Sequence, residues 1–209
     1  MSETNEPKSD KLKEVYGDRT VEDQRRIYRE WAETYDSQTR NEFGWMGFIP
    51  AAEEFSKRVT DTGSRILDAG CGTGLSGVAL ARQGYENIHG RDLSPEMLAI
   101  AKETGAYKSL AEVDLTAPLP ESGSFDAVIA VGVFGFGPPD PEHIPYLVAA
   151  AKPGCPVMLT VNGKGWIDRN WQEVLPQVVE RSGLNHEETL DIPYLEKEEI
   201  DGKFLVFRA

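Results

Sequence analysis

Apolar and polar residues near the start of the chain follow the period of a helix. The apolar side chains recur every three or four residues and form one aromatic-rich stripe: Ile27, Tyr28, Trp31 and Tyr35. Thr20 and Asp23 precede this stripe with the spacing of a capping box. A second helix is predicted over residues 51–59. We therefore expect a helical extension over residues 20–60, and a mobile polar tail over residues 1–19.

From residue 61 onwards, short apolar runs alternate with helical patterns. Strands are predicted at 65–68, 87–91, 107–113, 125–131, 156–161, 184–195 and 204–207. Helices are predicted at 75–83, 94–105, 143–151 and 166–182, and Pro176 is expected either to kink the last of them or to start a new turn. This alternation is typical of an α/β fold: a Rossmann-like, doubly wound, mostly parallel seven-stranded sheet with helices on both faces. We expect a single domain over residues 1–209, with its Rossmann-like core at 61–209.

Alternating glycines follow the first predicted strand. Gly70, Gly72 and Gly74 allow turns with positive φ and bring main-chain N–H groups close to a ligand, at the N-terminus of the next helix. The segment therefore predicts a nucleotide-cofactor loop. Residues 72–77 fit the dinucleotide pattern G-x-G-x-x-G, and residues 68–74 fit D-x-G-x-G-x-G. Asp68, which ends the strand, suits a ligand with a cationic amino-acid end and would repel a pyrophosphate.

Residues 67–74 and 92–98 together resemble the class I methyltransferases that use S-adenosylmethionine. The resemblance implies S-adenosyl-L-methionine as the cofactor. It places Asp92 on the ribose hydroxyls, Asp114 on the adenine amino group and Met97 against the adenine ring. The full set of cofactor-binding residues that it implies in the core is Asp68, Gly70, Cys71, Gly72, Gly74, Asp92, Leu93, Met97, Asp114, Leu115 and Val131.

The aromatic stripe has two interpretations within this family. Tyr28, Trp31 and Tyr35 would either close over the sulfonium as a lid and contact the cofactor, or simply pack a helix on the core. A narrower resemblance, carried by residues 28–36, 131–133 and 151–154, is to the methyltransferase-like group of the Williams–Beuren chromosomal region. It bears on the fold and the cofactor more than on the reaction.

Charge and composition restrict the partners. The formal net charge of −13, without any run of Lys and Arg, disfavours a nucleic-acid partner. The two cysteines, Cys71 and Cys155, are too few for a metal site or a disulfide framework. No apolar stretch has the length of a membrane span. We expect a cytoplasmic protein without a metal, as a monomer or homodimer.

The methyl acceptor is not specified by any motif. Residues 135–140 lack the Pro-Pro-Tyr/Phe pattern of exocyclic-amine methylases that act on nucleic acids, and Cys155-Pro156 reverses the order that a cytosine C5 enzyme needs. The clustered acids of metal-dependent catechol chemistry are also missing. The residues expected near the methyl group are mostly apolar or aromatic. We predict a substrate pocket formed by Phe134, Phe136, Asn162 and Trp166.

These observations favour an S-adenosylmethionine-dependent methyltransferase that acts on a small-molecule acceptor by in-line methyl transfer. The catalytic residues are unknown: His89, His143 and His186 are scattered, and we assign a general base to none of them. Two alternatives stay open. The first is an NAD-type dinucleotide-dependent oxidoreductase, and the second is a non-catalytic partner protein that binds S-adenosylmethionine.

Overall fold

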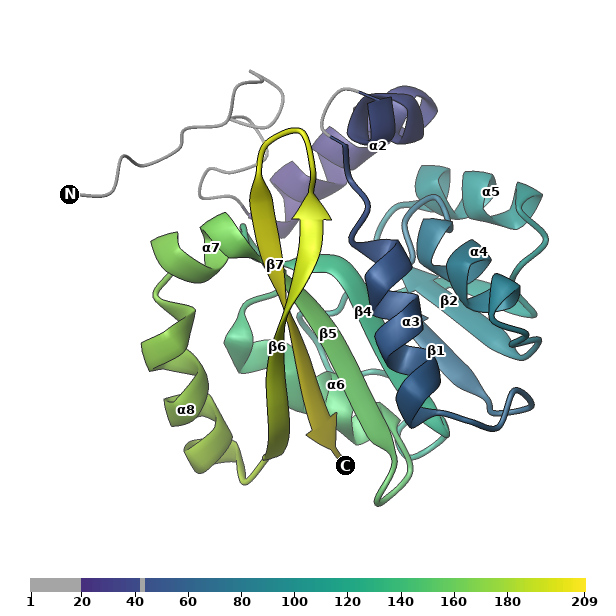
Figure 1. The fold of residues 1–209 in the computed structure, drawn as a ribbon. Helices are drawn as coiled ribbons and strands as arrows, with labels where there is room; N and C mark the ends of the chain where they lie inside the picture. The colour runs from purple at the N-terminus through teal and green to yellow at the C-terminus, as the bar shows by residue number, and fades with distance from the viewer. Residues whose placement is uncertain (1–19, 42–43) are drawn as a thin grey trace.

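A seven-stranded sheet organises the computed structural model, which describes residues 20–41 and 44–209. The strands are β1 (Ile66–Ala69), β2 (Ile88–Asp92), β3 (Ser109–Glu112), β4 (Ala127–Phe134), β5 (Pro156–Asn162), β6 (Asn185–Leu195) and β7 (Ile200–Arg208). Their order is β3-β2-β1-β4-β5-β7-β6, and only the pairs made by β7 are antiparallel (Figure 1). The predicted α/β class and mostly parallel sheet are therefore confirmed. The tail predicted at residues 1–19 lies outside the described residues.

Helices cover both faces of the sheet. They are α2 (Val21–Asn41), α3 (Phe48–Arg58), α4 (Leu75–Arg82), α5 (Pro95–Glu103), α6 (Ile144–Ala150), α7 (Gly163–Asp168) and α8 (Trp171–Ser182), with a 3₁₀ turn at Pro141–His143. The core under α3 and α4 contains Ile66 and Phe204, and the core under α6 and α8 contains Leu67 and Phe207. Neighbouring strand residues point to opposite faces, so consecutive apolar residues supply both cores. α2 lies at the upper end of the molecule in Figure 1.

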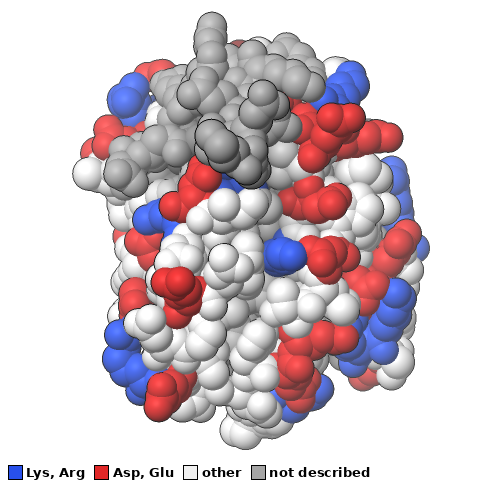
Figure 2. Space-filling view, turned by 60° about the vertical axis from the view of Figure 1, so that its left-hand side comes forward, with Lys and Arg blue, Asp and Glu red and all other residues white. Residues whose placement is uncertain are grey.

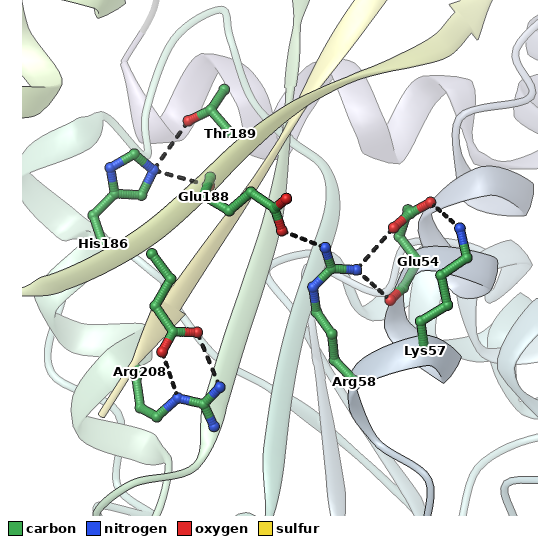
Figure 3. Close-up of polar contacts among 8 residues, drawn as sticks. Glu54, Lys57, Arg58, His186, Glu188, Thr189 and Arg208 are labelled. Carbon is green, nitrogen blue, oxygen red and sulfur yellow. Dashed lines mark hydrogen bonds and ion pairs between the residues drawn. The ribbon is translucent and has the colours of Figure 1, made fainter.

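An ionic bridge connects α3 to the β6 edge of the sheet (Figure 3). Arg58, at the end of α3, contacts Glu54 of the same helix at 2.8 Å and Glu188 of β6 at 2.5 Å. Its guanidinium also lies 5.7 Å from the ring centroid of Phe204. Contacts shared by one partly shielded arginine stabilise more than an isolated surface pair does. The bridge therefore fixes α3 on the sheet.

The break in the helical stretch after β5 does not lie where the sequence predicted it. Two helices, α7 and α8, are separated at Asn170, and Pro176 continues inside α8. Asn170 takes a left-handed conformation with φ of 51°, which asparagine tolerates, and its side chain donates to Glu173 at 2.6 Å. The single helix predicted over residues 166–182 was therefore wrong, because the polar turn at Asn170 ends α7 and α8 begins after it.

The predicted helix starts carry the expected side-chain caps. The Asp23 N–H donates to Thr20 Oγ1 at 3.1 Å, and the Thr20 N–H donates to the Asp23 carboxylate at 3.1 Å. At the start of α5, the buried Ser94 Oγ accepts from the Met97 N–H at 3.2 Å, with Pro95 in the first turn. Both caps confirm what the sequence spacing predicted.

We expect Ser94→Ala to lower the free energy of unfolding by about 1 kcal/mol, because the Met97 N–H then loses its partner in a buried site. Urea denaturation measures the change. Ser56→Ala is the matched control, since that exposed hydroxyl bonds only a carbonyl of its own helix. An equal loss in the two variants would show that the Ser94 cap contributes nothing.

Candidate active site

The glycine loop between β1 and α4 is fixed on one side and open on the other. Gly70, Gly72 and Gly74 have φ of 74°, 52° and 97°, the left-handed conformations that favour glycine. The N–H groups of Gly70 and Cys71 donate to the Arg91 carbonyl at 2.7 and 3.0 Å. A Cβ added to Gly72 would meet no atom within 4 Å. The loop therefore rests on β2 and presents Gly72 to open space.

Asp92, the last residue of β2, joins this loop to the start of α5. One of its carboxylate oxygens accepts from the Gly72 N–H at 2.8 Å, and the other accepts from the Ser94 N–H at 2.9 Å. Burial raises the pKa of Asp92, and these backbone hydrogen bonds oppose the shift. Each carboxylate oxygen has a second lone pair, so Asp92 can also accept hydrogen bonds from a ligand.

Asp68 lies fully buried beneath the loop. Its Oδ2 accepts from the Ser76 hydroxyl at 2.6 Å and from the Tyr107 hydroxyl at 2.7 Å. Its Oδ1 is buried and has no hydrogen-bond partner among the described residues. Burial raises the pKa of Asp68 to about 6, the two hydroxyl donors oppose the shift, and the charge of Asp92 adds to it. A buried carboxylate oxygen without a partner is a place where a cationic group or an ordered water is favourable.

Tyr107 explains the third glycine of the pattern at residues 72–77. A Cβ added to Gly77 would lie 2.3 Å from the Tyr107 hydroxyl oxygen. The Gly77 N–H donates to the same hydroxyl at 3.1 Å, and the hydroxyl in turn donates to Asp68. Gly77 therefore makes room for a tyrosine that positions the buried acid. The match to G-x-G-x-x-G thus has a structural cause that does not require a dinucleotide.

A pocket of about 840 Å³, open to solvent, lies between α2 and the loops that follow β1, β2 and β4. We call it the loop pocket. It brings together most of the predicted cofactor residues: Tyr28, Tyr35, Gly70, Cys71, Gly72, Asp92, Leu93, Met97, Asp114, Leu115 and Val131. Asp68 lies beneath it, Gly74 caps α4 against Tyr107, and Trp31 faces a second pocket instead.

The second pocket, of about 590 Å³, adjoins the first. We call it the aromatic pocket. Its lining residues are Tyr28, Trp31, Tyr35, Thr39, Trp45, Gly132, Val133, Phe134, Phe136, Asn162, Tyr194 and Leu195. The wall that it shares with the loop pocket consists of Tyr28, Tyr35, Trp45, Gly132 and Val133.

The structure brings three of the four predicted substrate residues together. Phe134, Phe136 and Asn162 line the aromatic pocket, whereas Trp166 lines neither pocket and stacks on Trp171 with ring centroids 6.0 Å apart. The Asn162 carboxamide oxygen accepts from two N–H groups at the start of α7, at 2.9 and 3.3 Å. Asn162 is therefore also a helix cap. Trp166 was predicted there because it is an aromatic residue in the segment that follows β5, but its ring packs on α8 instead.

Trp45 and Tyr194 complete the aromatic pocket, and the sequence did not indicate either. A Cβ on Gly132 would lie 2.9 Å from the Trp45 ring, and a Cβ on Gly202 would lie 2.5 Å from the Tyr194 ring. Burial raises the pKa of Tyr194 to about 12. The two aromatic residues are far apart in the chain, so no local pattern links them. Only the antiparallel pairing of β6 with β7 places Tyr194 beside Gly202.

The stripe on α2 serves both as core and as pocket wall. Ile27 and Trp31 are 2% and 3% exposed, while Tyr28 and Tyr35 line both pockets. Polar contacts connect α2 to the core around the loop pocket: Arg25 with Glu112 at 2.9 Å, Arg29 with Glu96 at 3.3 Å, and the Thr73 hydroxyl with Asp36 at 2.5 Å. Exposed ion pairs of this kind stabilise weakly. α2 is thus held over the pocket mainly by its buried apolar face, and the exposed ion pairs add little.

The histidines lie outside both pockets. His89 contacts the side chains of Asn87 and Ser109, His143 lies in the turn before α6, and His186 is half-buried on β6. Among residues 20–41 and 44–209, no three His, Cys, Asp or Glu side chains are grouped so that they could hold a metal ion.

Comparison with known proteins supports one family. Residues 66–154 match the family model of the methyltransferase domain. The chain is 43% identical over 97 residues to human methyltransferase-like protein 27, an alignment that covers 46% of this chain and 39% of the relative. It is 37% identical over 116 residues to ubiquinone biosynthesis O-methyltransferase from Xylella fastidiosa, covering 52% of this chain and 43% of the relative. The matches thus span about two fifths of the length of these curated relatives.

Solved structures share the fold over most of the chain. A TehB-like SAM-dependent methyltransferase from Corynebacterium glutamicum superposes with a TM-score of 0.63 at 24% identity, covering 87% of this chain and 97% of that one. A possible histamine N-methyltransferase from Thermotoga maritima superposes with a TM-score of 0.64 at 17% identity, covering 88% and 98%. At this identity the likeness concerns the fold alone.

Proposed function

We propose that this chain, which carries a methyltransferase domain of the class I S-adenosylmethionine-dependent family, transfers the methyl group of S-adenosyl-L-methionine to a small-molecule acceptor. The observation that carries the proposal is that two pockets share one wall. One is lined by the glycine loop and by the half-buried Asp92 and Asp114, and the other by aromatic side chains. A methyl donor and its acceptor must meet at the transferred carbon, and adjoining pockets allow this.

The loop pocket fits S-adenosylmethionine at both of its ends. Beneath the pocket, the unpartnered Oδ1 of Asp68 offers its charge to the ammonium of the methionine part, and in the pocket wall Asp92 suits the ribose hydroxyls. Asp114 Oδ1 already accepts from the Thr116 N–H and hydroxyl, so its other oxygen would accept from the adenine amino group. Met97 and Leu115 offer apolar surface to the ring. When bound, this cofactor supplies a methyl group activated by a positively charged sulfur.

Positioning and exclusion of water are the contributions that the residues of this chain would make. Gly132 and Val133, at the end of β4, lie in the wall between donor and acceptor. Tyr28 and Tyr35 of α2 line both pockets, so α2 would act as a lid over the reacting atoms. In-line transfer needs the reacting atoms at near-attack distance, and holding them there can supply much of the rate enhancement.

The surface and the relatives are consistent with a small acceptor. On the face in Figure 2, Asp and Glu side chains are interspersed with Lys and Arg, and the described residues form no continuous basic patch there. The relatives in Xylella are named as ubiquinone biosynthesis O-methyltransferases, which favours a small molecule over a macromolecule. No helix in residues 20–41 and 44–209 is long and apolar enough to cross a membrane. We further propose a cytoplasmic monomer or homodimer that acts as one domain.

The test follows a labelled methyl group. The protein is incubated with methyl-labelled S-adenosylmethionine and with separate small-molecule, protein and nucleic-acid fractions. We expect label in the small-molecule fraction, and calorimetric binding of S-adenosylhomocysteine without binding of NAD(H). Label on protein or nucleic acid alone would contradict the acceptor class. Binding of NAD(H) in place of S-adenosylhomocysteine would contradict the cofactor.

We expect Asp92→Asn to weaken S-adenosylhomocysteine binding by roughly ten- to a hundredfold, because hydrogen bonds to a charged group contribute about 1.5–3 kcal/mol. Isothermal calorimetry measures the affinity, and a thermal unfolding scan checks that the loop still folds. Asp61→Asn is the control: this exposed acid accepts from the Gly63 N–H in a remote turn and should leave the affinity unchanged. Unchanged affinity in Asp92→Asn would remove Asp92 from the cofactor site.

A further inference from the structure

One wall of the aromatic pocket is a cluster of four rings, those of Tyr28, Trp31, Tyr35 and Trp45. Trp31 and Tyr35 meet edge to face with centroids 4.8 Å apart, and Tyr28 stacks on Trp31 at 6.3 Å with an interplanar angle of 17°. Trp45 continues the wall, 6.3 Å from Tyr35. Aromatic faces carry negative electrostatic potential and attract cations, most strongly where water is excluded. The pocket therefore favours a positively charged group over an anion of the same shape.

The described residues that line this pocket include no Lys, Arg, His, Asp, Glu or Cys. An anionic acceptor would lose its hydration there without gaining a cationic partner, which is costly. The titratable side chains in the lining are tyrosines. Burial, with the nearby Tyr28, Tyr194, Asp36 and Asp92, raises the pKa of Tyr35 well above its usual value, and burial raises that of Tyr194 to about 12. Neither tyrosine is thus a base near neutral pH.

Because the described lining of the aromatic pocket contains no general base, oxygen and nitrogen acceptors would differ in reactivity there. A hydroxyl oxygen is a weak nucleophile until a base removes its proton, and the described lining offers none. The acids of the neighbouring loop pocket do not line the aromatic pocket, and in the proposed complex Asp92 and Asp114 would be occupied by the ribose hydroxyls and the adenine amino group. An uncharged amine nitrogen needs no such help, because its lone pair is available at neutral pH.

The movement of charge agrees with the aromatic wall. The nitrogen lone pair forms the new N–C bond to the methyl carbon, the C–S bond breaks, and its electron pair stays on sulfur. One positive charge thus passes from sulfur to nitrogen, and any proton on that nitrogen leaves to water afterwards. Rings that face the acceptor side stabilise the charge where it arrives. With a phenolate or carboxylate acceptor, the negative charge of the oxygen and the positive charge of the sulfonium would cancel as the methyl group is transferred. No positive charge would then remain on the acceptor for the rings to stabilise.

We propose that the acceptor is an uncharged amine nitrogen on a small aromatic or apolar molecule seated in the aromatic pocket. This inference rests on the proposed function and adds the acceptor atom to it. It excludes hydroxyl and carboxylate oxygens as the main acceptors.

The first test compares matched acceptors. Each member of a panel of arylamines is paired with the phenol and the carboxylate on the same carbon skeleton, starting with aniline, phenol and benzoate. Transfer from methyl-labelled S-adenosylmethionine is measured across pH. We expect at least tenfold faster transfer to the amine than to the phenol, with a rate that levels off above the pKa of the amine itself. Equal or faster transfer to the phenol or the carboxylate overturns the inference and leaves the proposed function standing.

A second test is independent of turnover. Phenyltrimethylammonium mimics a methylated product, and its binding is measured by calorimetry beside benzoate and the uncharged isostere tert-butylbenzene. We expect the cation to bind best, and Trp45→Leu to weaken its binding by about 3- to 30-fold while Trp45→Phe retains most of it. S-adenosylhomocysteine binding is measured in each variant. Equal losses for the cation and its isostere overturn the inference.

The two measurements separate the two proposals. If S-adenosylhomocysteine binds and no small molecule accepts the label, the proposed function fails, and the inference fails with it. If the label is found on oxygen in a small-molecule product, only the inference fails. Label on nitrogen together with preferential binding of the cation supports both.

Discussion

Gly77→Ala is expected to destabilise the protein by about 1–3 kcal/mol, the range for overpacking a filled interior. In most helices this substitution is stabilising, by roughly 0.5–1 kcal/mol, because alanine restricts the unfolded chain. Here the new Cβ would lie 2.3 Å from the Tyr107 hydroxyl and ring, both held inside the protein. We expect the clash to outweigh the helix preference, because the Tyr107 hydroxyl is held by hydrogen bonds to Asp68 and to the Gly77 N–H and the ring cannot move away without breaking them. Urea denaturation at constant pH measures the change.

The control removes the obstacle and keeps the substitution. In a Tyr107→Ala background, Gly77→Ala should be neutral or stabilising, since the ring that the Cβ would meet is absent. A double-mutant cycle then yields a coupling free energy between the two sites of at least about 1 kcal/mol. If Gly77→Ala destabilises both backgrounds equally, Tyr107 is not the reason for the glycine.

Gly77 also shows where sequence reasoning ends. The glycine loop, the Ser94 cap and the alternation of strands and helices were all predictable, because each is a local pattern set by backbone sterics or by a neighbour three or four residues away. The side chain for which Gly77 makes room is distant in the sequence. Tyr107 is thirty residues further along the chain and reaches the glycine only because β3 returns beside β2.

The residues of the aromatic pocket were harder to predict for the same reason. Trp45 and Tyr194 are about 150 residues apart and come together only through the pairing of their segments. No sequence spacing therefore predicts that they line the same pocket. Trp166 fits an apolar pattern but stacks on Trp171, because the chain turns at Asn170. On α2 the period correctly predicted one apolar face. It did not separate Trp31, which is buried, from Tyr28 and Tyr35, which also border the loop pocket, because all three occupy the same stripe.

Cofactor binding should weaken as the pH falls below about 6. In the unliganded protein burial raises the pKa of Asp68 to about 6, so its carboxyl is largely protonated at pH 5. An ammonium placed at its free Oδ1 would favour the charged carboxylate and lower that pKa, so binding releases a proton. The Kd of S-adenosylhomocysteine should therefore rise roughly tenfold between pH 7 and pH 5. Calorimetry in two buffers of different ionisation enthalpy counts the protons released.

Asp68→Asn separates this acid from its neighbour Asp92, whose pKa is also raised by burial. We expect the variant to bind more weakly at pH 7 and to lose most of the pH dependence, whereas Asp92→Asn should retain it. A variant with the proton release of the wild type would assign the titration to another group. Tyr107→Phe should keep the pH dependence and move it to higher pH, because it removes one of the two hydroxyl donors that lower the pKa of Asp68.

The stability of the unliganded protein should respond to Asp68 in the opposite direction. Because the folded pKa of about 6 lies above the usual 3.8, the stability that this carboxyl contributes is fully present below about pH 4 and is lost as the pH rises through 6. Between pH 4 and pH 7 the loss amounts to roughly 2–3 kcal/mol. Asp68→Asn, neutral throughout, should gain this amount on the wild type over the same interval while it binds the cofactor less well. An acid that lowers the stability of the unliganded protein and strengthens ligand binding is retained for the ligand. If the stability difference between the wild type and Asp68→Asn does not change with pH, Asp68 has a structural role instead.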